Sequence, residues 1–348
     1  MILPLAIVER WPMEEYKLQH RTIEEALKHN VTDAFKLYHE IELLKALELK
    51  QRDKESRGLD KKLDVLLREK EERLFRLIKF SDYAAMTMAA YPDAEFMSSA
   101  TYKRKKKNIT DPILVRGIKA GAYIKQAYNR GQDYYFIETG YLGNYRHDNN
   151  QTGRKVYHRI EKNNMQIDRI MDVPDDRWQA LCEWNPSLTY RGWRKPGSKI
   201  LLVMSTEKPF EFYGDDRQQW IDNTISTIQQ HTDRPIVIRE KAGRGERTND
   251  TIYDALDDDI YALVTYNSIA AVEAIQHGIP AFSLAPTAAS PVSSTDLTQI
   301  ENPPRPDEDL VYRWLSSIAY AQFSLDEIIT GRAWEMVLEN AERPALDS

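Results

Sequence analysis

The feature that most constrains the fold is a regular alternation of short buried strands and helices across residues 199–282. Four apolar, β-branched runs have the length and composition of strands that are buried on both faces: 199–204, 235–239, 260–265 and 279–282. Helical patterns at about 216–231 and 268–277 lie between them. Strands that alternate with helices predict right-handed βαβ crossovers and a parallel sheet.

The first half of the chain carries a weaker form of the same pattern. Its expected strands cover residues 3–8, 83–90, 113–115 and 134–137, with a helix after the third that runs to about Asn129. A highly charged helical tract occupies residues 13–80, and Gly58 divides it into an expected helical hairpin. This tract is either a solvated helical pair or a platform for a partner or acceptor.

The length of 348 residues fits two domains. Residues 171–199 are rich in proline and tryptophan and show little periodicity, so we interpret them as the connection. The prediction is an α/β fold with two Rossmann-like doubly wound halves and a helical insertion in the first. The expected bounds are 1–172, a linker at 173–198, and 199–348 with a helical tail at about 307–340. Ligands of such folds bind in the crevice at the strand ends.

Composition excludes several classes of protein. The formal net charge of -6 means that any contact with nucleic acid must come from a local basic patch. The lone Cys182 allows no intrachain disulfide and fits a reducing compartment, where it is expected to be a buried small residue. The start of the chain lacks the pattern of a signal peptide, and no run approaches the ~18 apolar residues of a membrane span. A cytoplasmic protein with no membrane partner is therefore expected.

Residues 265–282 hold the most informative pattern for function. A buried strand ends at Thr265, and Asn267 or Ser268 is expected to cap the helix that follows. Free backbone N–H groups and the helix dipole at that position would favour phosphate groups. Glu273 comes about one and a half turns later and could accept hydrogen bonds from a ribose diol. Gly278 ends the helix, and Pro280 opens the next strand.

This order of strand, polar turn, helix with an internal glutamate and His-Gly-Ile-Pro resembles the donor-nucleotide segment of GT-B-fold glycosyltransferases. The resemblance is to the capsular-polysaccharide and Kdo-transferase-like group, particularly its phage-encoded members. Further segments resemble the same group: 116–143, 235–241, 296–303 and 314–334. Glu240 and Lys241 stand where that group usually has a proline and often a histidine.

The resemblance implies an enzyme that moves a sugar from a nucleotide sugar, with UDP as the expected nucleotide, to a hydroxyl group. It implies a donor site in the second half formed by Arg239, Lys241, Arg244, Thr265, Asn267, Ser268 and Glu273. Basic groups there would stabilise the charge that develops on the leaving phosphate. No Asp-x-Asp metal pattern stands in a convincing loop, and the run Asp257–Asp259 is expected to be a solvated turn. No obligatory metal or other cofactor is therefore expected.

Glu138 is the candidate catalytic base. It ends a buried strand in the acceptor half, and sugar transfer needs a hydroxyl group that is deprotonated as it attacks the anomeric carbon. Alternatively, Glu138 pairs with Arg116 or caps the turn that follows. His147 and His158 are competing candidates for the base.

The candidate acceptor-binding residues centre on the strongest block of positive charge in the chain, together with two residues that the resemblance adds: Lys103, Arg104, Lys105, Lys106, Lys107, Arg116 and Tyr141. The block is either a site for a polyanionic acceptor or a flexible solvated loop. Basic residues between Arg146 and Lys162 lie near it in sequence, with Tyr145 and Tyr157 among them as possible stacking partners for bases.

Three functions remain open from sequence. The first is a glycosyltransferase that acts on a hydroxymethylated pyrimidine in double-stranded, phage-type DNA, which would have to flip the base out of the duplex and would work in the host cytoplasm. The second is a glycosyltransferase that acts on a capsular or surface glycan. The third is a non-catalytic scaffold that binds nucleotide sugars.

Overall fold

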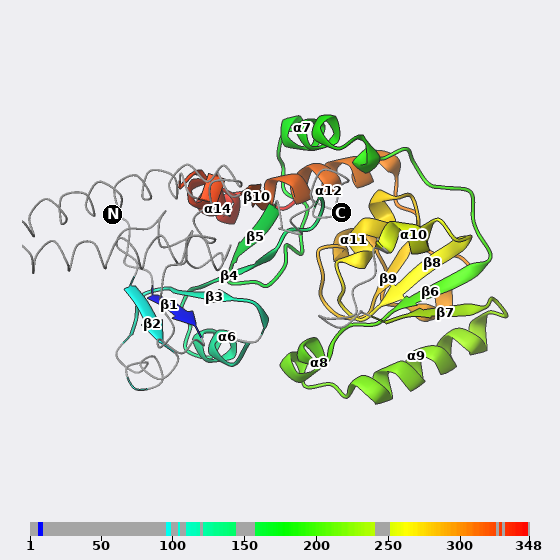
Figure 1. Ribbon diagram of the computed structural model, residues 1–348, viewed down its shortest axis with the longest axis horizontal. Coiled ribbons are helices and arrows are strands. Elements are labelled where there is room, and N and C mark those ends of the chain that lie inside the picture. The colour runs from blue at the N-terminus through cyan, green and yellow to red at the C-terminus, as the bar shows by residue number, and fades with distance from the viewer. Residues whose placement is uncertain are drawn as a thin grey trace, which may run out of the picture. The chain divides into compact units, whose positions relative to one another are not determined.

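The structure is a computed structural model of the 348-residue chain (Figure 1). It describes residues 6–9, 95–98, 104, 109–118, 121–143, 157–240, 251–324, 327–328 and 331–346. The chain divides into two compact units, Met1–Glu138 with Ser324–Glu335 and Thr139–Phe323 with Met336–Ser348. The predicted helical tract 13–80 and the predicted strand 83–90 lie outside the described residues, and the predicted domain bounds stay a prediction.

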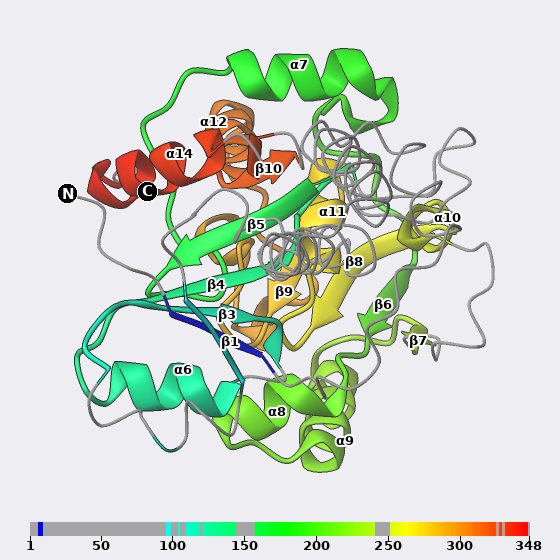
Figure 2. The ribbon, with the colours of Figure 1, turned by 60° about the vertical axis from the view of Figure 1, so that its left-hand side comes forward.

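The first unit contains parallel strands. Strand β1 (Ala6–Glu9) pairs with β2 (Glu95–Ser98) on one side and with β3 (Ile113–Arg116) on the other, and β3 pairs with β4 (Tyr134–Thr139). Strands were predicted near β1, β3 and β4 and are confirmed. Helix α6 (Gly121–Tyr128) lies against β3 (Figure 2), and its residues Tyr123, Ile124 and Ala127 are buried.

Three strands of this sheet were not predicted: β2, β5 (Tyr157–Lys162) and β10 (Gln322–Ser324). Among the described residues the strand order is β10-β5-β4-β3-β1-β2. The sequence of β5, YHRIEK, mixes charged residues with apolar ones and lacks the continuous apolar run of β4. It therefore does not look like a buried strand in the sequence.

The second unit contains a four-stranded parallel sheet that confirms all four predicted strands. Its members are β6 (Lys199–Val203), β7 (Ile236–Arg239), β8 (Ile260–Thr265) and β9 (Ala281–Ser283), in the order β7-β6-β8-β9. Every residue of β8 is buried. A central strand covered on both faces needs apolar residues at successive positions, which explains why it is easy to recognise in the sequence.

Helices cover both faces of this sheet (Figure 1). On one face, Ile200 and Leu202 pack in a cluster with Ile221 and Ile228 of α9 (Arg217–His231), which follows the short α8 (Glu207–Tyr213). On the other face lie α10 (Ile252–Leu256), α11 (Ala270–Gln276) and α12 (Glu308–Tyr320), whose buried residues join Leu201 and Val203. The second half of the chain is therefore a mixed α/β layer structure with helices on both sides of a parallel sheet.

Two further segments contain elements that the sequence did not predict. The segment 171–199, interpreted as the connection, contains α7 (Asp176–Trp184) and a 3-10 turn, Pro186–Leu188. Only Trp178 and Leu181 of α7 are buried, so the helix leaves little periodicity in the sequence. The tail, expected to be helical throughout, is broken by β10 between α12 and α14 (Arg332–Glu342).

Within the described part of the chain, no helix combines the length and the apolar composition that a bilayer crossing requires.

Candidate functional site

The order of the second sheet marks one position at its carboxyl edge. From β6 the chain goes outward to β7 and then returns to the opposite side of β6 to form β8. In open parallel sheets this reversal leaves a crevice beyond the carboxyl ends of the two central strands, and ligands bind there. The residues that follow β6 and β8 therefore define the candidate site, which lies entirely in the second unit.

Ser205 and Asn267 meet at this reversal point. Ser205 Oγ donates to Asn267 Oδ1 at 3.3 Å, and both residues are more than nine-tenths buried. One step earlier, Thr265 Oγ1 donates to the Val203 carbonyl at 2.8 Å, which ties the ends of β8 and β6 together. The Thr265 hydroxyl group thus links the two strands, whereas Asn267 lies at the crevice.

A second loop reaches the same position from the end of β5. Gln166 is buried, and its Nε2 donates to the Asn267 carbonyl at 3.3 Å while its Oε1 accepts from the Ala288 N–H at 3.1 Å. The same loop carries Asp168, whose charge adds to burial in raising the pKa of Tyr213. Gln166 therefore fixes the backbone around Asn267 and was missed by sequence reasoning.

Arg217 supplies the positive charge at this edge. It is the first residue of α9, and its Nε donates to the Ser205 carbonyl at 3.0 Å. Its Nη2 bonds to the Glu240 carboxylate, which follows β7, and its Nε lies 3.9 Å from Glu207 Oε1. Among the described residues, Nη1 of Arg217 has no hydrogen-bond partner. The only sequence signal for Arg217 was its place at the start of the helix after the first strand of the sheet.

The turn after β8 is held by aromatic packing. Tyr266 stacks on Phe210 with ring centroids 4.0 Å apart, and Trp220 meets its edge at 5.6 Å. The Tyr266 hydroxyl group donates to Asp215. Burial first, and then this carboxylate, raise the pKa of Tyr266 above its usual value. The neighbouring Asn267 is therefore carried on a rigid support.

The predicted phosphate ligands are only partly described. Arg239 ends β7, and its Nη2 donates to the Thr251 carbonyl at 3.0 Å. Lys241 and Arg244 lie outside the described residues. The structure thus brings Ser205, Arg217 and Asn267 together, whereas the roles of Arg239, Lys241 and Arg244 stay predictions.

The expected helix cap was wrong in detail. Helix α11 begins at Ala270 with Ile269 at the cap position, not Asn267 or Ser268. The Ala270 N–H donates to Ser268 Oγ, the Ala271 N–H to the Ser268 carbonyl, and the Glu273 N–H to the Ile269 carbonyl. Three of the first four N–H groups of the helix are therefore bonded within the chain, and we assign no phosphate site to them.

Glu273 is buried on the side of α11 that faces α10. Burial and then the charge of Glu273 raise the pKa of Tyr253, and the Tyr253 hydroxyl group donates to Gln276 Oε1 at 2.8 Å. The predicted contact of Glu273 with a ribose diol stays a prediction.

Glu138 lies in the first unit and is the second-last residue of β4. It is half-buried, and its carboxylate faces Gly117, where a Cβ would lie 3.1 Å from Glu138 Oε2. Gly117 has a φ of 65°, so a side chain there is disfavoured by the backbone as well. Of the competing bases, His158 is buried in β5 and His147 lies outside the described residues.

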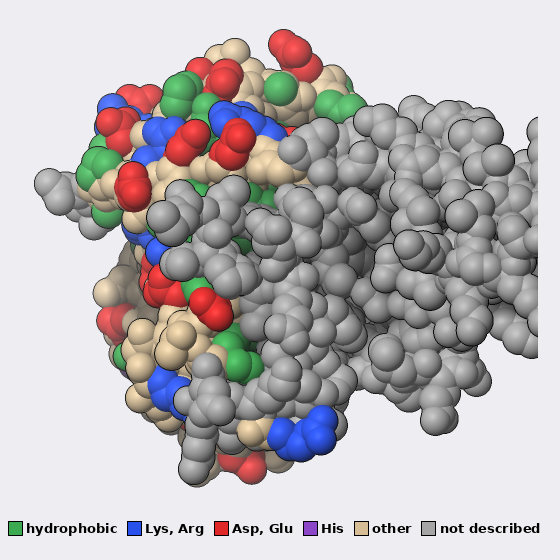
Figure 3. All heavy atoms as spheres, turned by 90° about the vertical axis from the view of Figure 1, so that its left-hand side faces the viewer, with side chains coloured by type: hydrophobic (Ala, Val, Ile, Leu, Met, Phe, Trp, Pro, Cys, Tyr) green, Lys and Arg blue, Asp and Glu red, His purple; other side chains and the backbone are tan. Residues whose placement is uncertain are grey.

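The predicted acceptor residues are mostly outside the described part of the chain. The structure does not describe Lys103, Lys105, Lys106 or Lys107. Arg104 is exposed, and the side chain of Arg116 is not described. On the face in Figure 3, Lys and Arg side chains alternate with Asp and Glu over the described surface. The described surface on this face therefore adds no broad basic patch to the acceptor prediction.

Tyr141 is buried and engaged with other residues of the second unit. Its hydroxyl group donates to Glu161 Oε1 at 2.9 Å and accepts from the Ile167 N–H at 2.8 Å. Arg159, expected in a basic cluster, is also buried and donates to the Thr139 and Met165 carbonyls at 2.7 and 3.1 Å. The guanidinium group of Arg159 thus binds backbone carbonyl groups of the fold. The acceptor role of Tyr141 stays a prediction.

The acidic run before β8 makes contacts within the fold. Asp257 pairs with Arg194 and His277, each at 2.9 Å, and Asp258 pairs with Lys199 at 3.0 Å. The Asp259 carbonyl accepts from the Ser198 and Lys199 N–H groups. In the part of the chain that the structure describes, no three His, Cys, Asp or Glu residues are grouped as metal ligands.

Comparisons with known proteins find likenesses among solved structures but none in sequence. No family model matches the chain, and a sequence comparison with curated proteins finds no relative. Among solved structures, the chain is similar to KpsC of Thermosulfurimonas dismutans, a β-Kdo 2,7-transferase. The likeness covers 74% of this chain and 95% of that one, at 13% sequence identity and a TM-score of 0.44. The function proposed below rests on this chain's own residues.

Proposed function

We propose that the chain is a glycosyltransferase that takes its sugar from a nucleotide sugar bound at the carboxyl edge of the second sheet. One observation carries the proposal. The reversal in strand order places two buried polar side chains, Ser205 and Asn267, beside a guanidinium group, that of Arg217. Parallel sheets use this position for nucleotides, because the loops after the central strands converge there. The resemblance of residues 235–241 and 265–282 to donor segments supports the same choice.

The chemistry assigns distinct roles to these groups. Negative charge grows on the nucleotide phosphate as the glycosidic bond breaks, and Arg217 is placed to stabilise it. Arg239, Lys241 and Arg244 are further candidates for the same role. Asn267 and Ser205 offer an amide and a hydroxyl group to the donor, and Glu138 is proposed as the base that takes the proton of the acceptor hydroxyl group.

The first test is a thermal-shift screen of the full chain with nucleotide sugars, including UDP sugars. Binding to the folded state raises the melting temperature by mass action. The stabilising donor is then titrated into the Asn267→Ala and Arg217→Met variants by calorimetry. Asn223→Ala, an exposed position on α9, serves as the control. A donor that binds both folded site variants as tightly as the parent chain would exclude this crevice.

The acceptor is a finer proposal. We propose a hydroxymethylated pyrimidine in duplex DNA, on the support of the basic block at residues 103–107 alone. The alternatives are a capsular or surface glycan and a scaffold that binds donors without transfer. Incubation with the stabilising donor and hydroxymethylpyrimidine DNA, followed by digestion to nucleosides and mass spectrometry, detects an added sugar. Transfer to a glycan without any mass added to DNA would select the second alternative.

The basic block has its own test. Replacing the five residues at 103–107 by serine should weaken binding to DNA of any sequence and flatten the dependence of affinity on salt, because fewer counterions are released. Donor affinity should not change. A DNA affinity and salt slope equal to those of the parent chain would remove the block from the acceptor site.

A further inference from the structure

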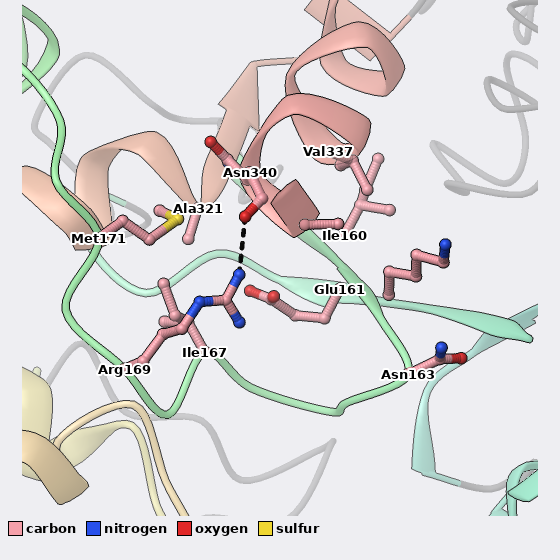
Figure 4. Close-up of a pocket in the computed structure, with 11 residues that line it drawn as sticks. Ile160, Glu161, Asn163, Ile167, Arg169, Met171, Ala321, Val337 and Asn340 are labelled. Atoms are coloured by element: carbon pink, nitrogen blue, oxygen red, sulfur yellow. Dashed lines mark hydrogen bonds between the residues drawn. The ribbon is translucent and has the colours of Figure 1, made fainter. Parts of the chain in front are cut away.

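A cavity of about 210 Å³ lies in the second unit, and its lining shares no residue with the crevice at the ends of β6 and β8. Figure 4 shows it among β5, the loop that follows β5, and the last turns of α14. Ile160, Ile167, Met171 and Val337 form apolar parts of its wall. The charged residues in its lining are Glu161, Lys162 and Arg169. Glu161 and Arg169 lie close to each other (Figure 4).

Each of these two side chains is held by one hydrogen bond and keeps unused capacity. Glu161 Oε1 accepts from the Tyr141 hydroxyl group at 2.9 Å, and Arg169 Nη2 donates to the Asn340 carbonyl at 2.7 Å. Within the described residues, Glu161 Oε2 and the Nε and Nη1 groups of Arg169 have no hydrogen-bond partner. The cavity therefore presents a free acceptor next to free donors, on side chains whose positions are already fixed.

We propose that this cavity binds one neutral sugar residue, whose adjacent hydroxyl groups bridge the Glu161 carboxyl group and the Arg169 guanidinium group. A hydroxyl group is both a donor and an acceptor, so a vicinal diol satisfies the two side chains together. The apolar wall fits the C–H face of a sugar ring, and the cavity is too small for a nucleotide sugar. The inference does not depend on the proposed transferase activity.

The charge state of the cavity favours a neutral ligand over an anion. Burial raises the pKa of Glu161 to about 7, although the Tyr141 hydroxyl group, Arg159 and Arg169 act in the opposite direction, and Asp168 adds to the rise. The nearby cations thus do not outweigh the loss of water around the carboxyl group. Above about pH 7, where Glu161 is ionised, an organic acid would place a second negative charge beside it, whereas a sugar hydroxyl group donates to the ionised form and stabilises it.

Two variants on α14 separate a real site from a general effect. Ala341 lines the cavity and is exposed, so Ala341→Trp should fill the entrance without disturbing the core. Leu338 is 45% exposed on the same helix and does not line the cavity, so Leu338→Trp is the matched control. Circular dichroism melts show whether both variants are folded.

Saturation-transfer NMR on the full chain with glucose, galactose, mannose and N-acetylglucosamine tests the proposal, with gluconate as the anionic probe. We expect at least one sugar to bind, with an affinity at least tenfold weaker in Ala341→Trp and unchanged in Leu338→Trp. Affinity should rise as the pH increases from 6 to 8, and Glu161→Gln should abolish this rise. No binding by any of the four sugars, binding that survives in folded Ala341→Trp, or tighter binding of gluconate would overturn the proposal.

Discussion

Arg217 Nη2 lies 3.2 Å from Oε1 and 3.0 Å from Oε2 of Glu240, so one amino group of the arginine contacts both oxygens of the glutamate. The pair joins the first residue of α9 to the residue that follows β7. The arginine is the more buried partner, with 21% of its side chain exposed against 63% for the glutamate. Glu240 therefore competes for the Arg217 guanidinium group with the donor phosphates that we propose bind there.

Replacing Glu240 by glutamine should tighten the binding of a nucleoside diphosphate such as UDP. The change removes the charge that competes with phosphate for Arg217 and leaves the guanidinium group bonded to the Ser205 carbonyl. Exposed ion pairs are weak, so the expected gain is roughly twofold to fivefold in affinity. Calorimetry with UDP measures it at low and at physiological salt, and the gain should shrink as salt rises.

Glu211→Gln is the matched control for this change, since Glu211 is an exposed carboxylate on the neighbouring helix α8. Equal tightening in both variants would indicate a general effect of net charge. Weaker UDP binding in Glu240→Gln would mean that Glu240 holds Arg217 in its binding position.

Glu273→Gln separates a structural role from the predicted ribose contact. The glutamate is buried, and its replacement by glutamine should lower the free energy of unfolding by about 1–3 kcal/mol because the hydrogen-bonding groups of a buried side chain change. If the side chain also accepts from a ribose diol, the affinity for UDP falls while the affinity for inorganic pyrophosphate stays constant. Urea unfolding and calorimetry with the two ligands measure both effects. Unchanged UDP affinity in a destabilised variant would leave Glu273 with the structural role alone.

The raised pKa of Glu161 makes stability depend on pH. The folded state holds the proton up to about pH 7, whereas the unfolded chain releases it near the ordinary pKa of 4.5. The contribution of Glu161 to the free energy of unfolding is therefore largest below pH 4.5, falls as pH rises to about 7 and is constant above that. The linkage relation sets the loss at up to about 3 kcal/mol. Urea unfolding from pH 5 to 8, compared with Glu161→Gln, isolates this term, and parallel pH profiles for the two proteins would contradict it.

The strands of the second sheet could be predicted because burial on both faces demands continuous apolar runs. Leu201 and Val203 face one layer of helices while Ile200 and Leu202 face the other, so no position in β6 tolerates a charge except its first. Strand β5 escaped prediction for the opposite reason. Its buried Arg159 donates to two backbone carbonyl groups, those of Thr139 and Met165, and the sequence does not show that these groups lie within its reach.

The candidate site was predictable only where one segment carries it. Asn267 follows a recognisable strand and was expected to cap the next helix, in the segment that resembles a donor site. Ser205 and Arg217 come from two other segments, and they meet Asn267 because the sheet reverses its order between β7 and β8. Gln166 comes from the loop after β5, which belongs to the other sheet. Strand order is a property of the whole sheet, so no local spacing in the sequence reveals it.

Glu138 and Gly117 give a paired test of the catalytic prediction in the first unit. Glu138→Gln keeps the size of the side chain but removes its basicity, so turnover should fall about 10²-fold or more with donor affinity unchanged. Gly117→Ala keeps the carboxylate but introduces a Cβ 3.1 Å from Oε2, which is closer than an ordinary van der Waals contact, on backbone with a φ of 65°. This variant should displace the Glu138 carboxylate and reduce turnover less severely than Glu138→Gln, with donor affinity unchanged. Rates with saturating donor, and melts to confirm folding, measure both effects. Full turnover in folded Glu138→Gln would exclude Glu138 as the base, whatever the result at Gly117.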